Sequence, residues 1–287
     1  MKVAILGSSG FLGNALCSQL KKRFKIYHTG LKRRKFNLNN YKRLKNFIIS
    51  CKPSLIINCA SLTDIDKCEN NKKESYNINT KLLNSIFKIK KKLKLKFQLI
   101  HFSTDQLYDG NSNANNNEKS KIKINNIYSL HKYLGEKICK KNKAIVFRTN
   151  FFGNNKNSFS NWICKKFKEK KRKDFFLFKD VYFSPLRVNT IAVIIKRIIN
   201  KKKLINVSGT FNLGSRKGLS KHKFAILYAK KLGIYSKDKY SAGYVNEIVK
   251  VKRSKNMKMD VAKFEKYFKI KMNTLKKEIE LEIKKYA

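Results

Sequence analysis

The stretch VAILGSSGFLGNAL near the N-terminus limits most strongly what this chain can fold into. A short apolar run, residues 2–6, ends at Gly7, and apolar residues follow at helical spacing from Phe11. Gly7 permits a sharp turn, Gly10 lets the backbone approach an anion, and Gly13 lets a helix pack closely on a strand. We therefore predict a strand, a tight turn and a helix whose N-terminus binds a phosphate group.

Strands and helices alternate along the first 150 residues. Residues 54–58 are almost wholly apolar, which is typical of a strand buried on both faces of a parallel sheet. The pattern predicts an α/β fold with a Rossmann-type doubly wound parallel sheet. The expected strands are residues 2–6, 25–28, 54–58, 97–102 and 144–148, and the expected helices begin at residue 11 and span 41–49, 77–89 and 127–139.

The alternation weakens after Gly153. We expect an NAD(P)-binding domain over residues 1–150, joined by parts of 180–205, and a smaller substrate-binding lobe over most of 151–287. Polar residues 110–126 form a long loop, and loops of this length are usually functional or disordered. Further helices are expected at 158–168, 188–199, 224–232, 261–264 and 274–286, with strands at 175–178 and 210–213.

The net charge of +50 would normally suggest a nucleic-acid partner. However, the abundant residues Lys, Asn, Ile, Phe and Tyr all have A/T-rich codons, so a base bias in the genome accounts for the lysines. Arg, which is better suited to phosphate and base contacts, is not enriched. The basic residues are also spread along every expected element, so we expect no specific nucleic-acid partner.

No run approaches the roughly 18 apolar residues that a membrane span needs, and the N-terminal apolar run is too short for a signal-peptide core. We therefore expect a cytoplasmic protein without a membrane partner. Six cysteines lie far apart, with no CxxC spacing and no histidine at metal-ligand spacing. They are interpreted as reduced packing residues, and no metal site is predicted from them.

Tyr128 and Lys132 are four residues apart in an expected helix, which places both on one face. A nearby ammonium stabilises a phenolate, so the tyrosine becomes a usable general acid. In a lysine-rich chain this spacing alone is weak evidence. Ser103, Thr104 and Asp105 end the fourth expected strand, and Thr104 can donate to the carbonyl oxygen that Tyr128 protonates. Together with the glycine turn, these residues predict hydride transfer to or from a carbonyl.

The segment after the second expected strand favours NADPH over NADH. An NAD site usually has an acidic residue there, whereas a 2′-phosphate attracts cations. The segment YHTGLKRRKF has no acid and contains Arg33 and Arg34. NADH stays open, because the same cations are equally typical of a basic protein surface.

Six motifs, in order over residues 1–271, resemble the dTDP-4-dehydrorhamnose reductase family of the extended short-chain dehydrogenase/reductases: GSSGFLG, INCASLTDIDKCE, FSTDQLYDG, YSLHK, FRTNFFG and RSKNMKMD. The resemblance implies that Tyr128 is the catalytic acid, that Lys132 assists it and holds the nicotinamide ribose, and that Thr104 supplies the hydroxyl. From the residues and the resemblance together, the expected cofactor site consists of Gly7, Gly10, Phe11, Leu12, Gly13, Arg33, Arg34, Cys59, Ala60, Ser61, Asn79, Ser103, Tyr128 and Lys132.

The resemblance further implies reduction of the 4-keto group of a nucleotide-linked 6-deoxyhexose. In this family the reaction yields dTDP-L-rhamnose, a precursor for cell-surface polysaccharide. The expected substrate residues are Thr104, Asp105, Arg148 and Arg253, with Arg253 near the diphosphate. Alternatively, Asn256 and Asp260 of the same motif as Arg253 cap the following helix.

Departures from the family concern the choice of sugar more than the chemistry. Ile124 and Ser129 stand where proline and glycine are usual, and Asn150 and Phe151 stand where serine and tryptophan are common. Two other classes stay open: a sugar-nucleotide epimerase or dehydratase, and a catalytically silent cofactor-binding regulatory subunit. Gln106, in place of the second acid of dehydratases, argues against dehydration. The sequence leaves open the sugar, a Mg²⁺ requirement and the oligomeric state, for which a homodimer is one option.

Overall fold

The computed structural model describes residues 1–29, 37–110, 114–169, 175–200, 204 and 207–284. The chain divides into two compact units. The sheet unit comprises residues 1–104, 126–148 and 189–211, and the second unit comprises residues 105–125, 149–188 and 212–287. Each unit is described by itself below.

A six-stranded sheet forms the centre of the sheet unit. Its strands are β1 (Lys2–Leu6), β2 (Lys25–His28), β3 (Leu55–Asn58), β4 (Gln98–Thr104), β5 (Ile145–Thr149) and β10 (Gly209–Leu213). Their order is β10-β5-β4-β3-β1-β2, and β2, β1, β3 and β4 are parallel neighbours. From β1 the chain adds β2 on one side, then returns to add β3, β4 and β5 on the other. The predicted doubly wound α/β fold is therefore confirmed.

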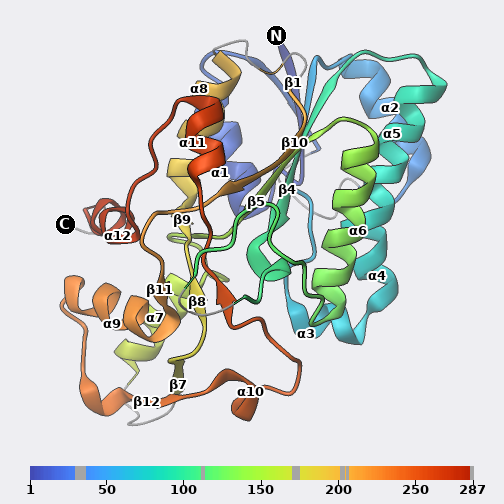
Figure 1. Ribbon diagram of the computed structural model, residues 1–287. Coiled ribbons are helices and arrows are strands. Elements are labelled where there is room, and N and C mark those ends of the chain that lie inside the picture. The colour runs from blue at the N-terminus through green and yellow to red at the C-terminus, as the bar shows by residue number, and fades with distance from the viewer. Residues whose placement is uncertain (30–36, 111–113, 170–174, 201–203, 205–206, 285–287) are drawn as a thin grey trace. The chain divides into compact units, whose positions relative to one another are not determined.

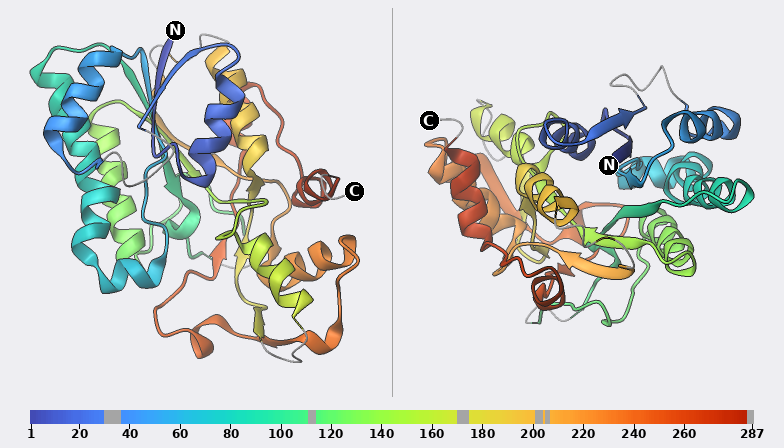
Figure 2. Two further views of the ribbon diagram at one scale, coloured as in Figure 1. Left: turned by 180° about the vertical axis from the view of Figure 1, so that it is seen from behind. Right: turned by 90° about the horizontal axis from the view of Figure 1, so that it is seen from above.

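Helices cover both faces of this sheet. Those of the sheet unit are α1 (Phe11–Leu20), α2 (Tyr41–Cys51), α3 (Ile65–Asn70), α4 (Lys72–Tyr76), α5 (Leu82–Lys92), α6 (Ile127–Lys141) and α8 (Val188–Asn200). Helices α2, α5 and α6 lie on one face, and α1 and α8 lie on the other (Figures 1 and 2). Both faces of β3 are buried, as its apolar sequence predicts.

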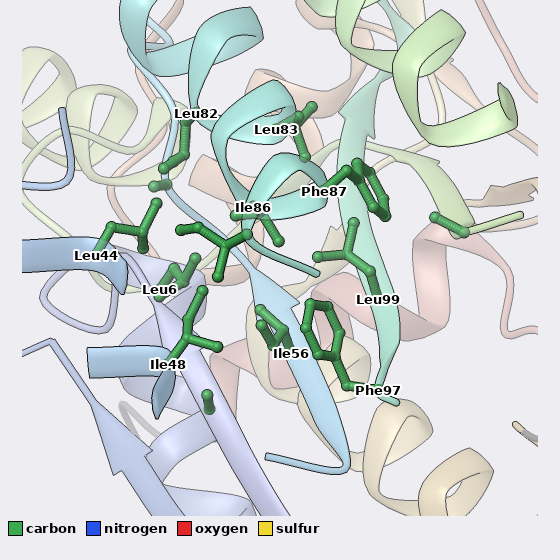
Figure 3. Close-up of a cluster of buried hydrophobic side chains, with 14 of the residues drawn as sticks. Leu6, Leu44, Ile48, Ile56, Leu82, Leu83, Ile86, Phe87, Phe97 and Leu99 are labelled. Carbon is green, nitrogen blue, oxygen red and sulfur yellow. The ribbon is translucent and has the colours of Figure 1, made fainter. Parts of the chain in front are cut away.

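The core on the α2 and α5 side is a continuous apolar cluster. Leu44 and Ile48 of α2 pack against the sheet beside Ile86 of α5 (Figure 3). The strands contribute Leu6, Ile56 and Leu99, all fully or almost fully buried. The helical spacing of apolar residues in α2 and α5 is therefore explained by the contact of these helices with the sheet.

One predicted helix differs in its first turn. Where residues 77–89 read as a regular helix, the chain forms a π-helical turn, η2 (Asn77–Lys81), before α5 begins. The short polar helices α3 and α4 also escaped prediction, because they lack an apolar period. π-Helical turns occur often at functional sites.

In its described residues, the second unit contains three small sheets and several helices around an aromatic core. Its elements are η3 (Asp105–Leu107), β6 (Phe151–Phe152), α7 (Phe159–Lys168), β7 (Phe175–Phe178), β8 (Tyr182–Phe183), β9 (Leu186–Arg187), β11 (Leu219–Ser220), α9 (Lys221–Lys231), η4 (Lys237–Lys239), β12 (Tyr240–Gly243), α10 (Val245–Ile248), β13 (Asn256–Met257), α11 (Ala262–Phe268) and α12 (Leu275–Ile283). The sheets are β11-β8-β13, β12-β7 and β6-β9. Phe224 is central to the core, with ring contacts to Phe152, Phe159, Phe183 and Tyr228.

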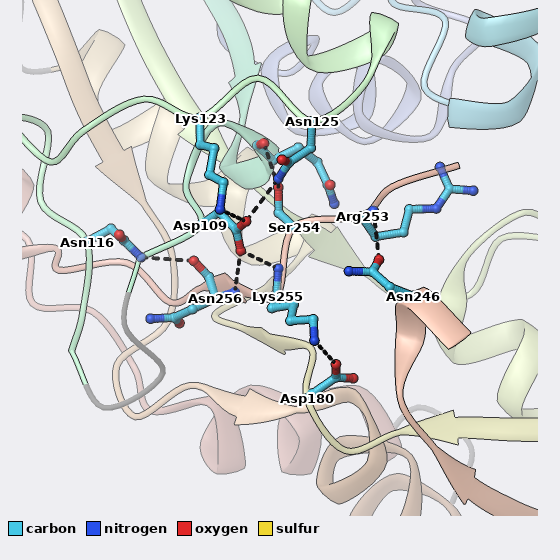
Figure 4. Close-up of polar contacts among 11 residues, drawn as sticks. Asp109, Asn116, Lys123, Asn125, Asp180, Asn246, Arg253, Ser254, Lys255 and Asn256 are labelled. Carbon is cyan, nitrogen blue, oxygen red and sulfur yellow. Dashed lines mark hydrogen bonds and ion pairs between the residues drawn. The ribbon is translucent and has the colours of Figure 1, made fainter. Parts of the chain in front are cut away.

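Most of the polar loop expected at residues 110–126 is held in place by hydrogen bonds. Asn116 donates to the carbonyl oxygens of Asn256 and Lys258, at 3.1 and 2.9 Å. Asp109, just before the loop, accepts from the backbone N–H of Lys255 at 2.7 Å and pairs with Lys123 at 3.0 Å (Figure 4). The described part of the loop is therefore anchored to the RSKNMKMD motif.

Among the described residues, no helix combines the length and apolar character needed to cross a membrane.

Candidate active site

The glycine turn after β1 is sterically demanding. Gly7 has φ +77°, and a Cβ added to it would lie 2.6 Å from the backbone nitrogen of Ala60. A Cβ on Gly13 would collide with the carbonyl oxygen of Gly7. The backbone N–H of Gly10 closes the turn by donating to Gly7 O at 3.0 Å. The turn can form only because glycine occupies positions 7 and 13, where the β3 connection and α1 approach it closely.

The N-terminus of α1 has features suited to an anion. Gly10 is the N-cap residue, no side chain caps the helix, and its first turn has no acidic residue. Backbone N–H groups and the helix dipole therefore favour a negative group at this end. A pyrophosphate fits this environment.

The segment after β3 is held by the π-helical turn. The side-chain oxygen of Asn79 accepts from Ser61 Oγ at 2.7 Å and from the backbone N–H of Leu62 at 3.1 Å. Asn79 Nδ2 donates back to Leu62 O at 3.0 Å. Burial raises the pKa of the neighbouring Cys59 thiol, so this cysteine stays protonated. Asn79 thus positions the segment that was predicted to line the cofactor site.

Three side chains fix the start of α6. Asn126 Oδ1 accepts from the backbone N–H of Ser129 at 2.9 Å, and Ser129 Oγ accepts from the backbone N–H of Asn126 at 3.2 Å, which forms a capping box. Glu69 accepts from the backbone N–H of Ile127 at 2.7 Å. Ser129 is fully buried in this arrangement. Serine in place of the usual glycine at position 129 is therefore explained by its role in the capping box at the start of α6.

Tyr128 and Lys132 follow on one side of α6, and both are buried, with Lys132 only 1% exposed. Lys132 Nζ donates to the carbonyl oxygen of Phe102 at 2.7 Å, which links α6 directly to β4. Burial lowers the pKa of Lys132 to about 8, while the charge of Glu136 opposes that shift. An ammonium is thus held beside the end of β4, two residues before Thr104.

Ser103 and Thr104 end β4 and are both buried. Within the described part of the chain, Ser103 Oγ has no hydrogen-bond partner. Buried polar groups normally have a partner, so an unpaired hydroxyl at the carboxyl end of a central strand is consistent with a bound ligand. The groups in the sheet unit therefore fit a dinucleotide.

Arg148, which was expected to border the substrate, makes a different contact. Its Nε and Nη2 donate to the two carboxylate oxygens of Glu136, at 2.9 and 2.6 Å. Sequence analysis missed this buried ion pair, because the two residues lie on separate elements, α6 and β5. A substrate contact of Arg148 stays a prediction.

Asp105 and Arg253 lie in the second unit. Asp105 is buried and accepts from Asn150 Nδ2 at 2.9 Å. Arg253 directs its guanidinium away from Asp109 (Figure 4). The charges of both Asp105 and Arg253 act on Lys221, whose pKa is lowered mainly by burial. Lys221 therefore lies within electrostatic range of both residues, and nothing in so lysine-rich a sequence distinguished it from the other lysines.

The alternative role of the motif at residues 253–260, capping the following helix, is not met, because the N-cap residue of α11 is Val261, with no side-chain cap hydrogen bond. Asp260 Oδ1 accepts from the backbone N–H of Ala262, the first residue of α11, at 2.8 Å. Asn256 instead donates to Ala114 O and so fixes the polar loop. Arg33 and Arg34, predicted to favour NADPH, lie outside the described residues.

The doubly wound sheet and the glycine turn define this chain as a Rossmann-type α/β protein of the dinucleotide-binding class. The family model described as RmlD substrate binding domain matches residues 1–287, and the chain belongs to that family. The predicted resemblance to dTDP-4-dehydrorhamnose reductases is thereby confirmed.

Individual relatives are distant in sequence. The chain is 24% identical over 168 residues to the spore coat polysaccharide biosynthesis protein SpsK of Bacillus subtilis, covering 57% of this chain and 58% of that one. It is 24% identical over 246 residues to the dTDP-4-dehydrorhamnose reductase of Salmonella typhimurium, covering 82% and 80%. A dTDP-4-dehydrorhamnose reductase of Bacillus anthracis, solved with NADP, shares the fold with a TM-score of 0.87 at 22% identity, over 100% and 99% of the chains.

Proposed function

We propose that this protein uses NADPH to reduce the 4-keto group of a nucleotide-linked 6-deoxyhexose, with dTDP-4-dehydrorhamnose as the candidate substrate. The observation that carries the proposal is the buried Lys132 on α6, bound to the carbonyl oxygen of Phe102 on β4, two residues before Thr104, and one helical turn from Tyr128. The names of the relatives support an oxidoreductase of this kind.

The residues that would hold the cofactor are those of the glycine turn, the segment after β3 and Lys132. NADPH supplies the hydride that adds to the carbonyl carbon of the substrate. Tyr128 gives its phenolic proton to the carbonyl oxygen as negative charge develops there. The ammonium of Lys132 stabilises the phenolate that remains, and the hydroxyl of Thr104 donates to the same oxygen.

The preference for NADPH has two supports: the cations at positions 33 and 34, and the NADP bound in the Bacillus anthracis relative. The substrate residues proposed in the second unit are Asp105 and Arg253, with Lys221 added because it shares their electrostatic environment. The two cations among them, Arg253 and Lys221, suit the diphosphate of a nucleotide sugar. The name of SpsK supports a role in polysaccharide synthesis.

The test is an NADPH-oxidation screen with dTDP-, GDP- and UDP-linked 4-keto-6-deoxy sugars. We expect turnover with at least one of them, and the highest kcat/KM with a dTDP-linked sugar. NADH in the same assay measures the cofactor preference. Cofactor binding without turnover of any sugar would favour the alternative, a silent regulatory subunit, and failure to bind either cofactor would overturn the proposal.

A further inference from the structure

His101 lies beside the candidate catalytic lysine, in a buried position that no step above uses. In the parallel register of β3 and β4 it is the partner of Asn58. Asn58 Nδ2 is 3.2 Å from His101 Nδ1, and both side chains are almost fully buried. The other side of the imidazole faces Lys132, with 3.5 Å between His101 Nε2 and Lys132 Nζ.

The contacts of Asn58 assign the tautomer of His101. Asn58 Oδ1 accepts from the backbone N–H of Ala60 at 3.2 Å, so its amide NH₂ must be the group that faces His101. A histidine nitrogen that receives an N–H donor is unprotonated, so Nδ1 of His101 is the acceptor. In the neutral ring the proton is then on Nε2, which faces Lys132.

If Lys132 is an ammonium, two N–H donors therefore face each other: Nε2–H of His101 and Nζ of Lys132. An ammonium cannot accept a hydrogen bond, whereas a neutral amine has a lone pair that can accept from Nε2–H. Lys132 Nζ also donates to Phe102 O, so the amine is restrained from two sides.

The surrounding charges agree with this arrangement. Burial and the charge of Lys132 hold the pKa of His101 well below its usual range, so the ring stays neutral. The other titratable groups that act on Lys132 are Glu136 and Cys139 of α6, Cys59 after β3 and Cys68 of α3. Burial raises the pKa of each of these three cysteine thiols, which keeps them uncharged at neutral pH.

We propose that His101 is a positioning residue for the reaction: Asn58 holds it as the Nε2–H tautomer, and His101 in turn fixes Lys132 Nζ and sets the upper end of the pH range over which Lys132 is the ammonium that stabilises the phenolate. This inference rests on the proposed function, because Lys132 acts through Tyr128.

The tautomer can be measured without any activity. The chain has four histidines, so a ¹⁵N-histidine NMR spectrum of the full-length protein is simple, and His101→Gln identifies the His101 signals. We expect a protonated Nε2, an unprotonated Nδ1, and no titration of this ring between about pH 5 and 8, where an ordinary histidine titrates. A protonated Nδ1, or titration of His101 near its ordinary pKa, would overturn the inference.

Two variants separate the two contacts of the ring. His101→Asn keeps an acceptor toward Asn58 but removes the group that faces Lys132, whereas His101→Gln keeps an N–H donor near Lys132. We expect His101→Asn to move the alkaline limb of the kcat/KM profile up by about one pH unit, which is a tenfold change in the dissociation constant of the Lys132 proton. His101→Gln should leave that limb close to the wild-type position.

The matched control is His131→Gln, which changes another buried histidine of the same unit, one bound to Ser75 at 2.8 Å. It should not move the limb. An equal shift in His131→Gln, or no shift in a folded His101→Asn, would contradict the role of His101. If no keto sugar is reduced, the proposed function fails, while the NMR measurement still decides the tautomer and the pH dependence of NADPH binding replaces the kinetic profile.

Discussion

Arg148 and Glu136 form a bidentate ion pair in which each side chain is only 6% exposed. The pair joins β5 to α6 one helical turn after Lys132. Its burial means that removal of either side chain would leave the other charge desolvated and without its bidentate contact, which makes the pair important for stability.

Removal of one partner should destabilise the protein. We expect Arg148→Met or Glu136→Gln to lower the free energy of unfolding by about 3–5 kcal/mol, measured by urea denaturation. The double variant Arg148→Met/Glu136→Leu should recover much of that loss, because it removes both charges of the pair together. A substrate role for Arg148 would instead appear as a raised KM in the double variant with restored stability.

Tyr128→Phe removes the proposed acid and keeps the ring. We expect kcat to fall by about 10²–10⁴-fold, the usual contribution of a general acid, while NADPH affinity changes little. NADPH fluorescence titration and steady-state oxidation measure the two quantities. Comparable turnover by the variant would show that another group delivers the proton.

The stability of the protein should depend on Lys132 at alkaline pH. Its pKa is about 8 in the folded chain, below the ordinary value near 10.4, so above pH 8 the unfolded state binds more protons at this residue. This contribution to stability therefore increases with pH between 8 and about 10.4. The difference in free energy of unfolding between wild type and Lys132→Met isolates it from other groups. A difference that is constant over this range would contradict the lowered pKa.

Gly7→Ala should weaken NADPH binding by at least about tenfold, because the new Cβ meets the backbone of Ala60 and the left-handed φ is strained. Gly233→Ala is the matched control. Gly233 has a similar φ, +69°, but no atom within 4 Å of an added Cβ. We expect Gly233→Ala to lower the free energy of unfolding through backbone strain and to leave the affinity for NADPH unchanged.

Ser129→Gly restores the residue usual in the family. Loss of the capping box should lower the free energy of unfolding by about 1 kcal/mol, with no change in the ranking of sugar substrates. Thermal unfolding and the substrate screen check both outcomes. A changed ranking would show that Ser129 also affects substrate choice.

The spacing of apolar residues in the sequence predicted most strands and helices of the sheet unit. The apolar run before Gly7 and the helical spacing after it specify β1, the turn and α1, since both periodicities act over a few neighbouring residues. The positions along the chain of the next four strands followed from the same alternation. Helix α9 begins three residues earlier than predicted, at Lys221, because a Ser220 cap replaces an apolar signal there.

Contacts between residues far apart in sequence could not be predicted in this way. Nothing local pairs Arg148 with Glu136, ties Asp109 to Lys255, or places Lys221 in the field of Asp105. The sequence by itself determined the class of fold and the candidate catalytic residues, through period and motif. Only the tertiary structure decided which buried charges and hydrogen bonds surround them, because desolvation and partner choice depend on which elements pack together.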